Sequence, residues 1–230
     1  MTALVLQARL DSSRLSEKAM LPLGGRPLIL RAMQALSFVS CDQKILACPE
    51  DSERVFAPLA EEAGFEIAVG PKEDVLERFC LAIKRCGARR IIRATGDNPF
   101  VFADAANALC EEADSLGADY AGFSALPYGA GVECVLSEAL FRAQREAQAA
   151  PEREHVCPYL YSRPDIFRLH RPLAPIKWQG ADIRITVDTG YDYHRAKALY
   201  EKLSALPANE QCRGENIIAA YRKLFGGGNG

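Results

Sequence analysis

The sequence lacks long uninterrupted hydrophobic runs, and no basic stretch precedes a hydrophobic one near Met1. A transmembrane helix needs about 20 mostly apolar residues, and a secretory signal needs a basic segment before its apolar core. We therefore expect no membrane association and a soluble, cytoplasmic protein. An excess of positive charge is missing too, because the net charge is −2 at pH 7. Since binding to a phosphate backbone needs a basic face, we expect no nucleic-acid partner.

Closely spaced cysteine or histidine pairs, which zinc sites need, are also absent from the sequence. The three histidines, His155, His170 and His194, lie far apart. The eight cysteines are scattered, and we expect them to be reduced and mostly buried rather than joined in disulfides. They are Cys41, Cys48, Cys80, Cys86, Cys110, Cys134, Cys157 and Cys212.

Short apolar runs alternate with segments of helical periodicity in the first half of the chain. The expected strands there are 4–6, 44–47, 66–69 and 90–94, and the expected helices are 27–39, 52–63, 75–86 and 103–116. This order predicts an α/β protein with a mostly parallel sheet that is covered on both faces. Later strands at 119–123, 132–136, 167–170 and 183–187 and helices at 137–148, 193–206 and 215–225 suggest added antiparallel pieces.

The chain length and its even composition indicate one domain. We place it at 1–225, with an excursion from the sheet at about 124–180, and we interpret 226–230, "GGGNG", as a flexible tail.

A cationic, serine-rich loop follows the first expected strand. It contains Arg9, Ser12, Ser13, Arg14 and Lys18 within ten positions. Ligands bind at the carboxyl ends of strands in open α/β sheets, and arginine, lysine and free backbone N–H groups suit a nucleoside triphosphate. The loop is neither a Walker motif nor a dinucleotide fingerprint. The structural alternative is a solvated basic loop in which one serine caps a helix.

Two aspartates follow expected buried strands. Asp97 ends "RIIRATGD", and Asp188 ends "IRITVD". Either residue alone is explained as the cap of the next helix. Together with the cationic loop, the pair predicts a Mg²⁺ site, because Mg²⁺ takes one or two carboxylates plus phosphate oxygens.

The sequence gives weaker evidence for a functional role of four further residues. Asp74 precedes an expected helix, so a helix cap explains it best, although it can also meet a nucleotide. Glu133 lies in an expected strand, where an inward carboxylate needs an arginine or a ligand as its partner. Arg153 and His155, in "EREHVCPYL", belong either to a charged helix start or to a contact with substrate or a second subunit.

Six ordered segments resemble the spore coat polysaccharide biosynthesis protein F family, whose relatives include the CMP-acylneuraminate and CMP-KDO synthetases. The resemblance runs from Leu4 to about Phe225. The segments are "QARLDSSRLSEKAMLPLGGRPLI", "DVLERF", "IRATGDNP", "GVECVLSEAL", "EREHVCPYL" and "RITVDTGYDYHRAKALYE".

The resemblance implies a three-layer α/β/α, Rossmann-like nucleotide-diphospho-sugar transferase fold with a mostly parallel mixed sheet, and a homodimer. It also implies a Mg²⁺-dependent cytidylyltransferase for surface polysaccharide biosynthesis, in which CTP and an acidic sugar or other anionic acceptor give a CMP conjugate and pyrophosphate.

The resemblance also implies roles for individual residues. Asp97 and Asp188 would hold Mg²⁺ and, with Arg14 and Lys18, would form the catalytic group. The residues implied to bind the nucleotide are Ala8, Arg9, Ser13, Arg14, Lys18, Ala47, Cys48 and Asp74. Those implied to face the acceptor or the dimer interface are Glu133, Arg153 and His155, and Arg184 is a further candidate for the acceptor.

The loop departs from the family pattern, because "RLSEK" replaces a usual Leu-Pro-Gly-Lys. Ser16 and Glu17 thus replace a stiff turn and add a carboxylate beside the expected triphosphate site. Two alternatives remain at this point: a glycosyltransferase of the same fold that uses a sugar nucleotide, and a non-catalytic regulator that binds a nucleotide.

Overall fold

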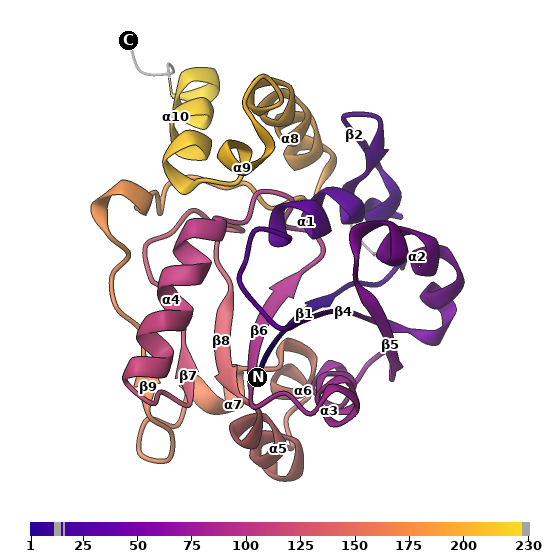
Figure 1. The fold of residues 1–230 in the computed structure, drawn as a ribbon, viewed down its shortest axis with the longest axis vertical. Helices are drawn as coiled ribbons and strands as arrows, with labels where there is room; N and C mark the ends of the chain where they lie inside the picture. The colour runs from indigo at the N-terminus through magenta and orange to yellow at the C-terminus, as the bar shows by residue number, and fades with distance from the viewer. Residues whose placement is uncertain (12–14, 16, 227–230) are drawn as a thin grey trace.

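A seven-stranded mixed sheet forms the centre of the computed structural model, which describes residues 1–11, 15 and 17–226 (Figure 1). The strand order is β5-β4-β1-β6-β8-β7-β9. Strands β1, β4, β5 and β6 are mutually parallel, whereas β8 runs antiparallel to β6 and β7. The bounds are β1 Thr2–Gln7, β4 Gln43–Pro49, β5 Glu66–Gly70, β6 Arg90–Thr95, β7 Tyr120–Ala121, β8 Glu133–Leu136 and β9 Leu169–His170.

Helices cover both faces of this sheet. One buried apolar cluster joins it to α1, α2 and α4, and a second joins it to α3, α5 and α7. The bounds are α1 Leu28–Leu36, α2 Glu50–Ala63, α3 Val75–Cys86, α4 Ala103–Ser115, α5 Ser137–Glu146, α6 Ala150–His155 and α7 Pro158–Tyr161. The predicted fold class, with its mostly parallel sheet and small antiparallel part, is therefore confirmed.

Strand β1 shows why the sheet is buried on both faces. Its inner residues are all buried, and they alternate between the two clusters: Leu4 and Leu6 belong to the first, and Ala3 and Val5 to the second. Near-continuous apolar strands of this kind are typical of parallel sheets with helices on both sides.

A third apolar cluster lies beyond the carboxyl ends of the central strands. It contains α8 (Gly190–Leu203) and α10 (Gly214–Phe225), with α9 (Ala208–Gln211) and the 3-10 turn η2 (Ile176–Trp178) between or beside them (Figure 1). Near the N-terminus, the 3-10 turn η1 (Lys18–Met20) leads into a short hairpin of β2 (Pro22–Leu23) and β3 (Arg26–Pro27).

The expected strand at 183–187 is wrong. Ile183, Ile185 and Val187 alternate in the sequence with polar residues, as in a strand. The structure buries Thr186 as well as these three, which pack in the third cluster. The backbone N–H of Ile185 donates to Tyr128 O at 2.9 Å, and that of Val187 donates to Asp97 O at 2.9 Å. The segment is extended, but it crosses the end of the sheet instead of joining its ladder.

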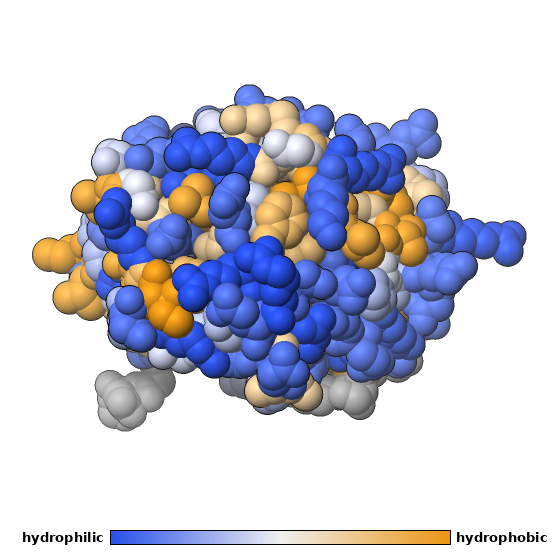
Figure 2. Space-filling view, turned by 90° about the horizontal axis from the view of Figure 1, so that it is seen from below, coloured by the Kyte–Doolittle hydropathy of each residue, from blue (hydrophilic) through white to orange (hydrophobic). Residues whose placement is uncertain are grey.

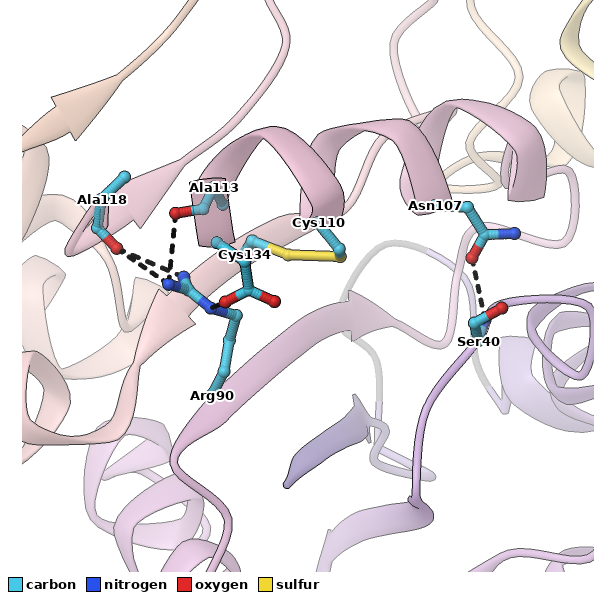
Figure 3. The surroundings of a disulfide bond; sticks show 8 residues. Ser40, Arg90, Asn107, Cys110, Ala113, Ala118 and Cys134 are labelled. Atoms are coloured by element: carbon cyan, nitrogen blue, oxygen red, sulfur yellow. Dashed lines mark hydrogen bonds and ion pairs between the residues drawn. A yellow bond between two sulfur atoms is a disulfide. The ribbon is translucent and has the colours of Figure 1, made fainter. Parts of the chain in front are cut away.

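The expectation that all cysteines are reduced is also wrong. A disulfide joins Cys110 on α4 to Cys134 on β8, with Cα atoms 6.0 Å apart (Figure 3). Beside it, the buried Arg90 of β6 donates to Asp114 Oδ1 at 2.6 Å and to the carbonyl of Ala118 at 3.2 Å. The other six cysteines are free, and Cys48, Cys80, Cys157 and Cys212 among them are buried.

None of the helices that the structure describes is long and apolar enough to cross a membrane. The face seen from below carries mostly hydrophilic residues, with hydrophobic ones in small separate groups (Figure 2). The predicted domain bounds, cytoplasmic location and homodimer stay predictions.

Candidate functional site

A cavity of about 680 Å³ lies at the carboxyl ends of β1 and β6. One part is lined by residues that follow these strands and by the start of α3. Another part extends over β8 and β7 toward the end of α6 and the residue after β9. The cavity therefore crosses the sheet at the edge where ligands of open α/β folds bind.

Both predicted metal-binding aspartates, Asp97 and Asp188, line this cavity, and both form ion pairs with the ammonium group of Lys18. Lys18 Nζ lies 3.0 Å from Asp97 Oδ2 and 2.9 Å from Asp188 Oδ1, and it donates to Val187 O at 3.2 Å. The side chain of Asp188 is 6% exposed and that of Asp97 is 27% exposed, so Asp97 is the more open of the two. Three segments far apart in the sequence thus meet at one point.

Backbone contacts hold these segments together. The N–H of Gly96 donates to Gln7 O at 2.8 Å, which fixes the turn after β6 against the end of β1. Gly129 has a φ of 97°, and a Cβ atom there would lie 2.6 Å from Thr186 N and 2.9 Å from Asn98 Oδ1. This close approach needs glycine, because any side chain would separate the loop from the turn that carries Asp97.

The structural alternatives for the two aspartates are not supported. The N-cap of α4 is Phe102, and that of α8 is Thr189, which forms a capping box with Asp192. Asp188 instead accepts from Arg184 Nη2 at 2.7 Å.

The donor chemistry at this point fits a hard divalent cation. Two carboxylates already converge on the ammonium group of Lys18, so the same oxygens are placed to share a metal ion. Within the described residues no group of three or more histidine, cysteine or acidic side chains is assembled for a metal. A Mg²⁺ ion here would therefore take its remaining ligands from water and substrate phosphate, which is how Mg²⁺ usually binds.

A hydrogen-bonded row of polar side chains crosses the floor of the other part of the cavity. Arg93 on β6 donates through Nη2 to Gln7 Oε1 at 3.0 Å and through Nη1 to Glu133 Oε2, with which it forms an ion pair. Tyr120 Oη donates to Glu133 Oε1 at 2.7 Å. The four residues come from β1, β6, β8 and β7, which are consecutive in the sheet. We call them the polar row.

The surroundings of the polar row shift the pKa of two members. Burial alone would lower the pKa of the Arg93 guanidinium, but the neighbouring groups, Glu133 foremost, together outweigh it, and the net shift of the pKa is upward. Burial, reinforced by Glu133, raises the pKa of the Tyr120 hydroxyl, which stays protonated as a donor. The predicted need of Glu133 for an arginine partner is met.

The structure brings some of the predicted site residues into the cavity and leaves others out. Besides Lys18 and the two aspartates, the predicted residues that line it are Ala8, Arg9, Glu133 and His155. Ser13 and Arg14 lie outside the described residues. Ala47 and Cys48 are fully buried and are not part of the lining. Burial raises the pKa of the Cys48 thiol to about 11.

Asp74, Arg153 and Arg184 are not part of the cavity lining. The Asp74 carboxylate caps α3 by accepting from Glu77 N at 2.9 Å, and it accepts from Arg153 Nε at 2.6 Å. Arg184 pairs with Asp188 and Asp192. Asp74 and Arg153 therefore tie α3 to α6, and their predicted contacts with nucleotide and acceptor stay predictions.

Several cavity residues were not found from the sequence. Arg78 is 2% exposed, and Nη1 donates to Pro71 O at 2.9 Å. Burial lowers the pKa of its guanidinium. Arg93 lies within the apolar run "RIIRAT". A charged residue at a core position of an expected strand was the feature of the sequence that could have identified it as a cavity residue. The others are Tyr120, Tyr161 and Arg171.

Comparisons with known proteins agree with this geometry. A family described as Cytidylyltransferase matches residues 3–220. The spore coat polysaccharide biosynthesis protein SpsF of Bacillus subtilis is 30% identical over 210 residues, which cover 88% of each chain.

Two solved structures share the fold. A cytidylyltransferase from Leptospira borgpetersenii has a TM-score of 0.87 at 21% identity and covers 97% of this chain and 94% of its own. A CMP:2-keto-3-deoxy-manno-octonic acid synthetase complexed with CTP has a TM-score of 0.68 at 17% identity and covers 89% of this chain and 99% of its own.

Proposed function

The chain belongs to the cytidylyltransferase family, and we propose that it joins CMP from CTP to an acidic sugar or other anionic acceptor, with release of pyrophosphate, for surface polysaccharide biosynthesis. The observation that carries the proposal is the convergence of Asp97, Asp188 and Lys18 at the carboxyl edge of the sheet. The polar row lines the same cavity, which supports adjoining places for a nucleotide and a second substrate.

The proposed reaction is a one-step, in-line displacement at the α-phosphorus of CTP. An acceptor oxygen forms the new P–O bond as the bond to the β-phosphate oxygen breaks, and that electron pair leaves with pyrophosphate. When the attacking group is a hydroxyl, its proton passes to water. Such transfers depend on positioning and charge stabilisation, so the enzyme needs no covalent nucleophile.

The chain's own residues bind and orient the reactants in this scheme. Asp97 and Asp188 would hold Mg²⁺, which when bound offsets phosphate charge. Lys18, Arg9 and Arg78 surround the nucleotide part of the cavity with positive charge. In this scheme the ammonium group of Lys18 moves away from Asp97 and Asp188. It then stabilises the negative charge that develops on the leaving pyrophosphate. Arg14 is proposed for the same task from the family resemblance.

A thermal-shift panel of CTP, UTP, ATP and GTP, each with and without Mg²⁺, tests nucleotide choice. A ligand at a hundred times its dissociation constant stabilises the native state by about 2.7 kcal/mol, which is easily measured. We expect a Mg²⁺-dependent shift with CTP, followed by pyrophosphate release when an acidic sugar is added. Sugar transfer without pyrophosphate release would overturn the proposal in favour of a glycosyltransferase. CTP binding with no turnover of any acceptor would favour a regulator.

We also propose a cytoplasmic homodimer, which the family resemblance supports. Light scattering that gives the mass of one chain at working concentration would contradict the dimer.

A further inference from the structure

We propose that Arg184 is a positioning residue for the proposed metal ligand Asp188. It holds one carboxylate oxygen of Asp188, so that the other oxygen is directed at the metal position between Asp188 and Asp97. The proposal rests on the proposed function, because the metal site that it concerns belongs to the same reaction.

The sheet does not hold Asp188 in place. The segment before it, 183–187, crosses the end of the sheet instead of joining its ladder. Asp97 differs, because it follows strand β6, which is paired with β1 as far as Thr95. The direction of the Asp188 carboxylate must therefore be set by contacts outside the sheet.

Arg184 separates the two oxygens of the Asp188 carboxylate by function. Its Nη2 donates to Oδ2 at 2.7 Å, whereas Oδ1 lies 2.9 Å from Lys18 Nζ. The same ammonium group lies 3.0 Å from Asp97 Oδ2. Oδ1 is therefore the oxygen of Asp188 that faces the point where both carboxylates can share a metal ion, and the contact with Arg184 leaves it there.

Arg184 is itself held on two sides. Its Nε donates to Asp192 Oδ1 at 3.1 Å, and its guanidinium lies 4.7 Å from the centre of the Tyr128 ring. Asp192 is anchored in turn, because its Oδ2 accepts from the backbone N–H groups of Asp188 and Thr189 at 3.1 and 3.0 Å. One carboxylate thus fixes both the backbone of Asp188 and the arginine that holds its side chain.

The chemistry of the two cations on Asp188 gives them opposite roles. Carboxylates that bind a metal are themselves hydrogen-bonded by neighbouring groups, and loss of such a group costs about 10- to 100-fold in metal affinity or activity. An arginine suits this task, since its planar fork binds two carboxylates at once, which a lysine ammonium on a flexible stem does not reproduce. Lys18 occupies the oxygen that a metal would take, and Arg184 occupies the other.

Binding of Mn²⁺ to the nucleotide-free protein, followed by electron paramagnetic resonance of free Mn²⁺, tests this role without turnover. We expect Arg184→Gln to weaken binding about tenfold or more, because the Asp188 carboxylate is no longer held. Arg184→Lys keeps the charge but not the fork, so it should weaken binding by less. If Arg184 were only a positive charge near the site, its loss would tighten binding instead, as we expect for Lys18→Gln.

Arg142→Gln is the matched control. The Arg142 side chain is 42% exposed and pairs with Glu146 four residues later, just as Arg184, which is 40% exposed, pairs with Asp188. Arg142 is not part of the cavity lining, so this variant should bind Mn²⁺ as the native protein does. Melting temperatures show whether each variant folds, and Arg184→Lys keeps the test available if Arg184→Gln does not.

Two results would overturn the positioning role: a Mn²⁺ affinity that is unchanged or tighter in Arg184→Gln, or a native protein that binds no Mn²⁺. An unchanged affinity together with a raised KM for the acceptor would assign Arg184 to the acceptor instead. Failure of the proposed function looks different. A protein whose Mn²⁺ binding depends on Arg184, but which releases no pyrophosphate from CTP with any acidic acceptor, would lose the cytidylyl assignment and keep the role of Arg184.

Discussion

The ammonium nitrogen of Lys18 lies 2.9 Å from Asp188 Oδ1 and bridges from there to Asp97, 3.0 Å away. Two carboxylates that face one another need a cation between them, because like charges at this range repel strongly outside bulk water. Lys18 supplies that charge in this structure. A metal ion that uses the same oxygens must therefore displace Lys18, which then becomes available to the phosphates of the nucleotide.

The first prediction concerns the competition between Lys18 and a metal ion for the carboxylates of Asp97 and Asp188. Lys18→Gln should tighten binding of Mn²⁺ to the nucleotide-free protein by about tenfold or more, because a competing positive charge within hydrogen-bond distance of the carboxylates is gone. The same variant should slow pyrophosphate release by about 100-fold, since a charge that stabilises the leaving group is lost. Electron paramagnetic resonance of free Mn²⁺ measures the affinity.

Lys72→Gln is the control for that experiment. Lys72 also lines the cavity, but it pairs with Asp11 and Asp51 instead of Asp97 and Asp188. We expect its Mn²⁺ affinity to match that of the native protein. An unchanged affinity in Lys18→Gln would contradict a shared site for metal and lysine.

The second prediction concerns the two carboxylates themselves. Asp97→Asn and Asp188→Asn should each lower kcat by about 100-fold or more, because each removes a negative ligand at the place where phosphate charge must be balanced. Asp182→Asn changes an exposed carboxylate nearby in the sequence and should leave kcat unchanged. Melting temperatures separate loss of chemistry from loss of fold. Near-normal turnover in either site variant would remove the metal assignment.

The sequence was sufficient to predict that Asp97 and Asp188 meet and not the polar row, for a physical reason. Each aspartate follows a local apolar run that the sequence shows, although only the run before Asp97 is a strand of the sheet and the run before Asp188 crosses the end of the sheet. The partnership of Arg93 with Glu133 depends on β6 and β8 being antiparallel neighbours in one register. That pairing is long-range, and nothing within "RIIRAT" specifies it.

Two predictions from the sequence are wrong because long-range contacts decide the structure at those places. The segment 183–187 has the alternating apolar sequence of a strand, but its hydrogen-bond partners lie at Tyr128 and Asp97, which only the tertiary fold brings near. Cys110 and Cys134 are separated by 24 positions in the sequence, and their proximity follows from the packing of α4 on the sheet. The spacing of scattered cysteines does not determine their connectivity.

The third prediction concerns that disulfide. In the denatured, unreduced protein we expect six reactive thiols, and eight after reduction, in agreement with one disulfide and six free cysteines. Chain-entropy arguments give a loop of this length about 3 kcal/mol of stabilisation, so reduction should lower the free energy of unfolding by about that amount. Thiol titration and urea unfolding measure the two effects, and eight thiols without reductant would contradict the disulfide.

Thiol reactivity in the native protein has a predicted pH dependence. Burial raises the pKa of Cys48 to about 11 and that of Cys80 to about 12. The thiolate is the reactive form, so at pH 8 both cysteines should react far more slowly than an ordinary thiol, whose pKa is about 8.5. Their alkylation rates should rise as the pH approaches these values. Mass spectrometry after timed iodoacetamide labelling identifies each site, and rapid labelling of Cys48 at pH 8 would contradict its burial.

The last prediction asks why Arg93 and Glu133 are charged at all. Glu133→Leu should lower the free energy of unfolding by up to about 3–5 kcal/mol, the range for breaking a buried ion pair, because it leaves the largely buried Arg93 without its carboxylate. Arg93→Leu should also destabilise, since Glu133 then loses its guanidinium partner and keeps the uncharged Tyr120 and Cys157 as donors. The double variant Arg93→Leu/Glu133→Leu should regain most of the loss, because apolar replacement of a whole buried ion pair is often neutral.

Urea unfolding of the four proteins gives the coupling energy of the pair, and additive losses would contradict direct pairing. The double variant also decides between a structural and a functional reason for the charges. If it is as stable as the native protein, stability does not explain why charged residues occupy this position in the sheet. The explanation must then come from the cavity above them, which Arg93 and Glu133 both line, and the same variant should bind CTP normally while losing turnover of the acidic acceptor.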